Sequence, residues 1–440
     1  MSAVTARQAT PSIDRYREAF EARWRTDDAL TQLRRTALER FLATGFPTQR
    51  HEDWKYTNLR RLEMRTFAPA EAAAFEVAQD RWIAGAGIRV VLVNGHSMPS
   101  LSTTSVQPPG VTLLTLGQWM RNDAPAAAQF LSTPQSAANG GAFEQLNLAF
   151  CEDGVVLDVA DGIIMDAPVY VVHQWHDAAL RMSHPRVIVR AGRHSRCTLI
   201  EHFLGPADVE YFTNAVTTID LAAGAAVRHY RVQQESPKSF HIAHVAVHQH
   251  ADSRYACHDI ALGGGLARAD ISTTLEGSGA HAMLHGLFAP TGSQHLDTHT
   301  RIEHVAPHTT SEEDYRGVAA GRGRGVFNGK VIVRPGAQKI DARQSSRNLL
   351  LSATAEIDTK PELEIYANDV KCSHGATTGQ LDETALFYLR SRGLSHSQAR
   401  ALLIRAFVAA VLSGVDHEPL RAHLERQLDE RFAAPTEDPT

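Results

Sequence analysis

Short alternating strand-like segments, each followed by a tight turn, recur along the middle of this sequence and restrict its fold more than any other feature. From about residue 143 to about residue 370, the segments are rich in Val, Ile, Thr and His and end in small residues. Successive turns lie roughly 17 to 32 residues apart, mostly near 29, which is the range in which a repeat indicates a solenoid. We therefore predict that each unit forms one rung of a stacked β structure. The units are residues 186–192 (RVIVRAG), 219–224 (IDLAAG), 245–252, 274–279, 302–307, 331–336 (VIVRPG) and 350–353.

Two other β architectures also place strands at regular spacing, namely a β-sandwich and a double-stranded barrel of the cupin kind. Asn-Gly and Asp-Gly hairpin turns are sparse inside the repeats. Their scarcity favours the solenoid slightly, because tight antiparallel hairpins use these dipeptides most often. The pattern alone leaves the alternatives open.

Helical patterns flank the repeat, as expected if the two ends of a stack need covers. On the N-terminal side, residues 26–44 carry an apolar stripe at steps of three and four, and residues 70–81 are rich in Ala and Glu. On the C-terminal side, helices are predicted at residues 382–392, 395–413 and 418–432. The second of these opens with Ser395 and Gln398 in the spacing of a capping box.

These patterns divide the chain into four parts. We predict an N-terminal helical region at residues 1–110, a β core at 111–376, a C-terminal helical region at 377–432 and a frayed tail at 433–440. The predicted fold class is mainly β, with helical regions on both sides of the core.

Composition excludes several classes of partner. Lys and Arg total 44 against 49 Asp and Glu, a formal net charge of -5, so no broad positive field is available for nucleic acid or an anionic membrane. The N-terminal residues lack the apolar stretch of a secretory signal, and no later segment approaches the roughly 20 apolar residues of a membrane span.

The four cysteines contain no C-x-x-C pair. We predict a protein of the reducing cytoplasm. The cysteines are Cys151, Cys197, Cys257 and Cys372.

The 23 histidines raise the question of a metal site. On a strand that rises about 3.3 Å per residue, the rings of an HxxxH pair stand roughly 13 Å apart and cannot share one ion. We therefore favour solvated or hydrogen-bonded positions along the rungs. The alternative is a metal-dependent enzyme, either a β-solenoid or a cupin-like protein, that uses the histidine-rich strands. The clustered residues are His241, His244, His248, His250, His281, His285, His295 and His299.

A glycine-rich stretch, residues 321–330 (GRGRGVFNGK), looks at first like a phosphate-binding loop. It lacks the required Gly-Lys-Ser/Thr spacing, because Val331 follows Lys330. We interpret it as a flexible basic loop between rungs and predict that the chain does not hydrolyse ATP. The motifs G-x-S-x-G and H-E-x-x-H do not occur either.

The strongest local candidate for metal chemistry is Cys372 with His374, directly after a predicted strand. In an extended chain the two side chains project to one face about 7 Å apart, near enough to address one cluster or ion. A single C-x-H is a weak signal. The alternative is a buried thiol beside a polar histidine at a sheet edge.

Two long stretches are similar to the core signature of the SufB/SufD family. They are VFNGKVIVRPGAQKIDARQSSRNLLLS at residues 326–352 and TKPELEIYANDVKCSHGAT at residues 359–377, followed by FYLRSRG at 387–393. Weaker similarity appears in RHEDWKYT at residues 50–57 and FEQLNLAF at 143–150. The KCSHGA and EDWKY forms resemble the SufD branch more than SufB.

The resemblance implies a right-handed parallel β-helix and a non-catalytic scaffold subunit for iron-sulfur cluster assembly. It implies pairing with a SufB-type paralogue and a SufC-type ATPase that docks on residues 382–432. The exposed β edges at the ends of a solenoid also make a homodimer possible when the chain is alone, and the sequence leaves open whether it forms. It also implies that His374 is a metal ligand at the subunit interface, with Cys372 as the second candidate. The cluster or iron would be transient, with no cofactor tightly bound in the isolated chain. None of Cys151, Cys197 and Cys257 can be matched to the sulfur-accepting cysteine of SufB.

Overall fold

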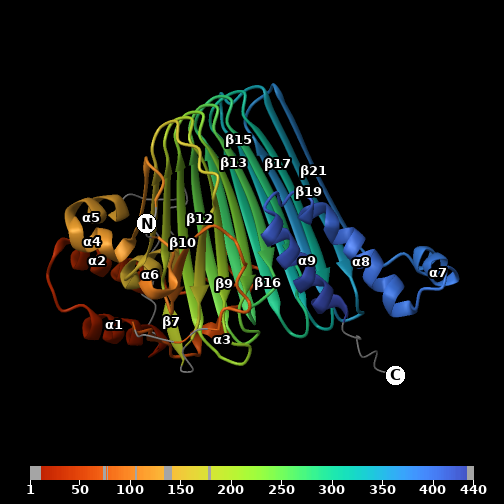
Figure 1. The fold of residues 1–440 in the computed structure, drawn as a ribbon, viewed down its shortest axis with the longest axis horizontal. Coiled ribbons are helices and arrows are strands. Elements are labelled where there is room, and N and C mark those ends of the chain that lie inside the picture. The colour runs from red at the N-terminus through yellow and green to blue at the C-terminus, as the bar shows by residue number, and fades with distance from the viewer. Residues whose placement is uncertain are drawn as a thin grey trace, which may run out of the picture.

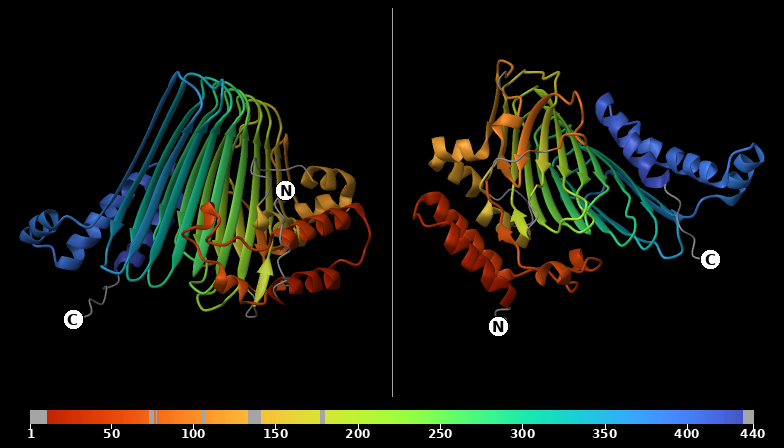
Figure 2. Two further views of the ribbon diagram at one scale, coloured as in Figure 1. Left: turned by 180° about the vertical axis from the view of Figure 1, so that it is seen from behind. Right: turned by 60° about the horizontal axis from the view of Figure 1, so that its bottom comes forward.

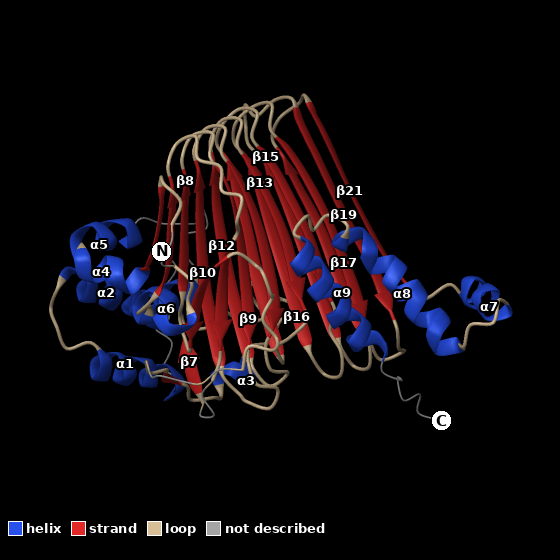
Figure 3. Ribbon diagram, viewed as in Figure 1, coloured by secondary structure: helices blue, strands red, loops and turns tan. Residues whose placement is uncertain are grey.

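The computed structural model describes residues 11–72, 76, 78–104, 107–132, 141–176 and 180–433. Its centre is a parallel β-solenoid in which the chain alternates between two sheets. Figures 1 and 3 show the strands stacked side by side, with helices on both sides of the stack. The prediction of a mainly β solenoid with flanking helices is confirmed. The β-sandwich and cupin alternatives are wrong, because the successive rungs pair in parallel.

Two long sheets form the walls of the solenoid. The 11-stranded sheet contains β1 (Ala68–Pro69), β4 (Val111–Thr115), β5 (Gly154–Val159), β7 (Arg181–Ser183), β8 (Arg186–Ala191), β10 (Phe212–Leu221), β12 (Phe240–Gln249), β14 (Leu266–Leu275), β16 (His295–His304), β18 (Arg324–Val333) and β20 (Glu356–Ile365). The 10-stranded sheet contains β2 (Ile88–Val93), β3 (His96–Ser97), β6 (Val169–Gln174), β9 (Arg196–Leu204), β11 (Ala226–Gln234), β13 (Arg254–Ala261), β15 (His281–Phe288), β17 (Thr310–Ala319), β19 (Ile340–Leu350) and β21 (Val370–Gly379).

The register of the sheets defines columns of side chains along the solenoid. One turn of the coil returns the chain to the same sheet after 26 to 32 residues: Asp270 lies opposite His244, and Lys360 lies opposite Asn328. Since partners in a parallel ladder point to the same face, each register row forms a column that faces either the interior or the outside. One interior column consists of Leu157, Val189, Ile219, Val247, Thr273, Ile302, Val331 and Leu363.

The turns that precede the strands of the 10-stranded sheet form a column of their own. His194, Gly224 and Asp252 hold φ of 56°, 72° and 58° in successive rungs. Each backbone amide donates to the next rung, for example His194 N to Ala223 O at 3.0 Å and Gly224 N to Ala251 O at 2.8 Å. A Cβ on Gly224 would lie 2.3 Å from His194 Nδ1. Glycine alternates with larger residues here because each larger side chain lies over the glycine of the next rung.

Helices of the N-terminal half cover the outer face of the 11-stranded sheet near its first rungs (Figures 1 and 2). Phe143 of α6 packs with Phe212 and Phe240 of the sheet, and Asp28 caps the predicted helix at residues 26–44 as α2. The helix predicted at 70–81 is wrong for its described residues, which are coil or turn. These helices are α1 (Pro11–Arg23), α2 (Ala29–Thr44), α3 (Arg60–Glu63), α4 (Leu116–Asn122), α5 (Ala124–Ser132) and α6 (Ala142–Phe150), with 3-10 turns η1 (Glu52–Trp54) and η2 (Pro99–Leu101).

The three predicted C-terminal helices are confirmed as α7 (Glu383–Ser391), α8 (His396–Leu412) and α9 (Glu418–Ala433). Ser395 and Gln398 form the predicted capping box. Helices α8 and α9 pack on the outer face of the 10-stranded sheet, where Ile404 and Leu424 share an apolar cluster with Tyr230. No helix among the described residues has the length and apolar character needed to cross a membrane.

The predicted domain boundaries stay predictions. Strand β2, before residue 110, belongs to the 10-stranded sheet, and α4 to α6 follow that residue. The frayed tail predicted at 433–440 lies outside the described residues, apart from Ala433 at the end of α9.

Candidate functional site

Cys372 and His374 both lie on β21, the last strand of the 10-stranded sheet. Cys372 is paired in register with Ala342, and His374 with Gln344. Since both partners belong to interior columns, the two side chains occupy the inner face of the final rung. We call this end of the solenoid, formed by β20 and β21, the mouth. His374 is exposed there and Cys372 is half-buried.

The mouth is a sheet edge. Within the described chain, β20 pairs only with β18 and β21 only with β19, so one side of each strand offers unpaired backbone groups. Figure 1 shows β21 at the end of the stack, with α7 directed away from it. An edge of this kind is a template on which another chain can add strands.

Behind His374, an interior column continues into the solenoid through Gln344 and Glu313. Gln344 Nε2 donates to Glu313 Oε2 at 2.6 Å, and both side chains are buried. Burial raises the pKa of Glu313 to about 7, and interactions with Thr300 and Gln344 offset only part of that rise. The exposed histidine thus lies next in register to a buried polar pair.

Cys372 is the accessible thiol among the four cysteines. Partial burial and the nearby Asp341 raise its pKa above the ordinary value, so the isolated chain favours the thiol form. Deep burial raises the pKa of Cys151 to about 11 and the pKa values of Cys197 and Cys257 to about 12. These three cysteines are inert structural thiols.

The clustered histidines mostly have carboxylate partners, as expected for satisfied rung positions. Among the described residues, no group of three or more His, Cys, Asp and Glu side chains could hold a metal ion. The ion pairs join His241 to Glu235 at 2.6 Å, His244 to Glu144 at 2.7 Å, His248 to Glu276 at 3.3 Å, His250 to Asp220 at 3.4 Å, His285 to Glu312 at 3.2 Å and His299 to Asp297 at 3.0 Å.

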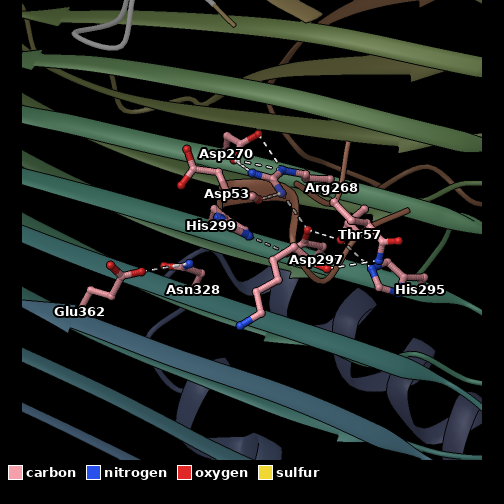
Figure 4. A network of polar contacts seen from close by, with 11 residues as sticks. Asp53, Thr57, Arg268, Asp270, His295, Asp297, His299, Asn328 and Glu362 are labelled. Carbon is pink, nitrogen blue, oxygen red and sulfur yellow. Dashed lines mark hydrogen bonds and ion pairs between the residues drawn. The ribbon is translucent and has the colours of Figure 1, made fainter. Parts of the chain in front are cut away.

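A buried ionic network on the outer face of the 11-stranded sheet was missed by sequence reasoning. Figure 4 shows Arg268 of β14 between Asp270 and Asp297, at 2.7 and 3.0 Å. Its guanidinium also lies 3.8 Å from the Trp54 ring centroid and donates to the carbonyl of Asp53. Burial opposes ionisation of Asp297, but His299 and Arg268 hold its pKa well below the usual range.

This network explains the EDWKYT segment noted in the sequence. Thr57 Oγ1 donates to Asp297 Oδ2 at 2.5 Å, and Lys360 Nζ lies 2.5 Å from Glu52 Oε1. The segment therefore attaches the N-terminal region to the side of the solenoid. A cavity of about 400 Å³ lies beside it, between Trp54, Phe143 and Lys330. The sequence feature that could have identified the site was a strand with charged side chains, together with a loop that contains acidic and aromatic residues.

The predicted flexible loop at residues 321–330 is wrong. Residues 324–330 form the first part of β18, and the preceding turn contains Gly321 with φ of 64°. Two glycines inside the strand leave room for interior side chains: a Cβ on Gly325 would lie 2.6 Å from the Phe288 ring, and one on Gly329 would lie 1.9 Å from Gln344 Nε2. Packing inside the solenoid accounts for the glycine-rich composition.

The C-terminal helices provide a second candidate surface. A groove of about 580 Å³ between α8 and α9 is lined by apolar residues, including Val408 and Phe432, and by the charged pair Arg405 and Asp429. On α7, the helix that precedes α8, Phe387 and Tyr388 are 73% and 56% exposed. An apolar groove and exposed aromatic residues are each typical of a protein interaction site.

The fold and these two surfaces define a parallel β-solenoid with an open end that carries a thiol and an imidazole, and with a helical attachment on its side. Residues 173–407 match the family described as SUF system FeS cluster assembly, SufBD core domain, and residues 12–171 match the SufBD protein N-terminal region. The chain belongs to the SufB/SufD family, and the recognition from sequence is confirmed.

Relatives extend along most of the chain. It is 32% identical over 405 residues to the iron-sulfur cluster assembly protein SufD of Escherichia coli strain K12, covering 90% of this chain and 91% of that protein. It is 32% identical over 412 residues to the iron-sulfur cluster assembly SufBD family protein slr0076 of Synechocystis, covering 91% and 90%. The chloroplastic protein ABCI7 of Arabidopsis thaliana is 27% identical over 402 residues, covering 89% and 84%.

Proposed function

We propose that this chain is a non-catalytic scaffold subunit for iron-sulfur cluster assembly and that it acts through its mouth. The observation that supports this most directly is the position of Cys372 and His374 on the inner face of an unpaired terminal rung. A similar protein of Escherichia coli is named as an iron-sulfur cluster assembly protein. The cluster is the cargo of such a scaffold, and its components enter and leave.

A SufB-type paralogue adds its own edge to β20 and β21 and closes the mouth. His374 supplies an imidazole to iron at this junction, with Cys372 as a second ligand and the remaining ligands from the partner. Imidazole and thiolate are established ligands of iron and of iron-sulfur clusters. A cluster held between two subunits is released when the junction opens, so transient binding follows from a shared site. When the paralogue is absent, the same edge supports a homodimer.

A SufC-type ATPase docks on the C-terminal helices, at the groove between α8 and α9 and the exposed aromatic residues of α7. The ATPase supplies the hydrolysis that this chain lacks. Movement of two bound ATPase copies toward each other would shift the two scaffold subunits and change the geometry at their junction. The cytoplasmic setting predicted from the cysteines suits a half-buried, accessible thiol at the mouth.

The test is anaerobic co-purification of the tagged full-length chain with a SufB-type and a SufC-type protein, scored for complex formation, iron and sulfide. We expect a three-protein complex whose cluster content falls at least about 10-fold in the His374→Ala variant, because loss of a ligand leaves iron under-coordinated. The control is His250→Ala, which removes an exposed histidine far from the mouth. Normal cluster content in His374→Ala would contradict the ligand role.

The enzyme alternative predicts a different outcome. A metal-dependent solenoid or cupin-like enzyme would be a chain that ignores both partners and holds stoichiometric metal that His248→Ala removes. The ion pairs of the clustered histidines in the described residues do not favour this alternative.

A further inference from the structure

The amide of Gln344 is fixed at one end and unsatisfied at the other. Its Nε2 donates to Glu313 Oε2 at 2.6 Å. Its Oε1 is buried, in a residue that is only 4% exposed, and has no hydrogen-bond partner among the residues that the structure describes. A buried acceptor without a donor is costly, so the position of this oxygen requires an explanation, such as a donor close to it.

The opposite sheet makes room for this amide. Gly329 of β18 faces Gln344 across the interior, and a Cβ at that position would lie 1.9 Å from Nε2 and 2.8 Å from Cδ. Any side chain at residue 329 would therefore displace the amide. The space left by Gly329 and the hydrogen bond to Glu313 therefore both fix the position of the Gln344 amide, from two different strands.

The neighbour of Gln344 on the mouth side is His374, its register partner on β21. Adjacent strands lie about 4.8 Å apart, which is within reach of a hydrogen bond between a glutamine amide and an imidazole. A neutral imidazole binds metal through one nitrogen, and the N–H of its other nitrogen almost always donates to a fixed acceptor. Gln344 Oε1 is such an acceptor.

We propose that Gln344 is a positioning residue for His374: its Oε1 accepts the imidazole N–H and leaves the other ring nitrogen, with its lone pair, directed into the mouth. This proposal rests on the proposed function, in which His374 binds iron. Glu313 is the anchor of the arrangement, because an amide flip would place Oε1 against its carboxyl group and lose the bond from Nε2. Nothing in the KCSHGA segment itself reveals the pair, since 30 residues separate Gln344 from His374.

The tautomer of His374 tests the proposal without any metal. The full-length chain is labelled with ring-¹⁵N histidine, and the His374 signals are assigned by their loss in His374→Ala. We expect one neutral tautomer in the native chain and a share of the other tautomer about fivefold larger in Gln344→Met, because a hydrogen bond of about 1 kcal/mol is lost. In Gln344→Glu the new carboxyl group shares one proton with Glu313 and still presents an acceptor oxygen to His374, so this variant is expected to keep a single tautomer.

Two further variants separate positioning from general damage to the fold. Gly329→Ala disturbs the amide from the opposite strand and is expected to reproduce the tautomer mixture of Gln344→Met. Asn348→Leu removes another buried amide from the same face of β19, beside Thr378, and is expected to leave the His374 tautomer unchanged. A native-like tautomer in both Gln344→Met and Gly329→Ala would overturn the proposal.

Iron binding by the assembled three-protein complex then distinguishes a failure of the proposed ligand role of His374 from a failure of the positioning role of Gln344. We expect Gln344→Met to weaken Fe(II) binding about 10-fold or more, which is the usual effect of removing a hydrogen-bond partner of a metal-binding histidine. If His374→Ala has no effect on Fe(II) or cluster content while the tautomer still depends on Gln344, the proposed ligand role fails and the positioning contact stands. If His374→Ala abolishes the cluster and Gln344→Met leaves both tautomer and iron unchanged, the positioning role fails and the ligand role stands.

Discussion

The two ends of the solenoid differ in how their interior is closed. At the first end, the parallel ladders stop at short antiparallel pairs, β4 with β5 and β3 with β2, and α4 and α5 pack nearby. Leu157 in that region is completely buried. At the mouth, the inner-face residues of β20 are mostly half-buried, including Leu363 of the same interior column, and those of β21 are exposed from His374 onward.

This difference shows how one repeating pattern serves two purposes. Both ends use the same alternation of inward and outward side chains, but the covered end buries the inward side chains in a core and the mouth leaves them partly uncovered. Solenoids need caps to remain monomeric and soluble. The uncapped end is therefore the feature on which the proposed association rests.

Matched truncations in one interior column give the largest expected effect. Leu157→Ala is expected to destabilise the isolated chain by about 3 to 4 kcal/mol, because it opens a cavity in a filled interior. Leu363→Ala, at the mouth, is expected to cost about 1 kcal/mol or less, since its side chain already contacts solvent. Urea midpoints of the two variants measure the contrast. Equal shifts would contradict the distinction between a covered and an open end.

Two buried carboxyl groups, at different distances from the mouth, make opposite contributions to the dependence of stability on pH. Burial alone would raise the pKa of Glu201, but His173 and His229, at 3.4 and 2.7 Å, hold it well below its usual range. Glu313, nearer the mouth, has no such ion pair in the described structure, and burial raises its pKa from 4.5 to about 7. Glu313 therefore contributes stability that is complete below its unfolded pKa and is lost as the pH rises through about 7.

The corresponding measurement is urea unfolding of the native chain and of Glu313→Gln between about pH 4.5 and about pH 9. We expect the native chain to lose about 3 kcal/mol more than the variant over this range. Glu201 acts in the opposite direction, because its contribution is lost only as the pH falls toward strongly acidic values. Identical pH profiles for the native chain and Glu313→Gln would refute the assignment.

The turn column gives a smaller expected effect. Gly224→Ala is expected to cost about 2 kcal/mol, since alanine is strained at φ of 72° and its Cβ would meet the His194 ring. Adding His194→Gly is expected to recover about half of this cost, because only the contact is relieved. Near the mouth, His308 and Lys339 follow each other in the same column without an intervening glycine. Lys339→Gly is expected to change the free energy of unfolding by less than about 0.5 kcal/mol. Thermal unfolding of the variants measures these differences.

Local signals in the sequence predicted the C-terminal helices well. Ser395 and Gln398 set the start of α8 through contacts within one turn, so no tertiary information was needed. The solenoid itself required more, because strand spacing does not distinguish stacked rungs from hairpins. Similarity to a known family supplied that choice.

The parts that could not be predicted depend on register. Rungs of 26 to 32 residues vary enough that no pattern places Gln344 beside His374 or Gly329 against Gln344. The glycines of β18 were interpreted as a loop because the sequence does not show which side chains face them across the interior. Arg268 escaped notice for a similar reason, since its partners come from three separate segments.

The attachment of the C-terminal helices has a mechanical consequence. Arg316 of β17 donates to the carbonyl of Phe407, Arg400 to that of Leu351 at 3.0 Å, and Arg431 to that of Ala289 at 2.8 Å. These hydrogen bonds attach α8 and α9 to the rungs that precede the mouth. The continuous ladders connect those rungs to β21. A force on α8 and α9 would therefore move the last rungs and His374 together as one rigid unit. In an assembly built from this chain, the flexible element would then be the interface between subunits.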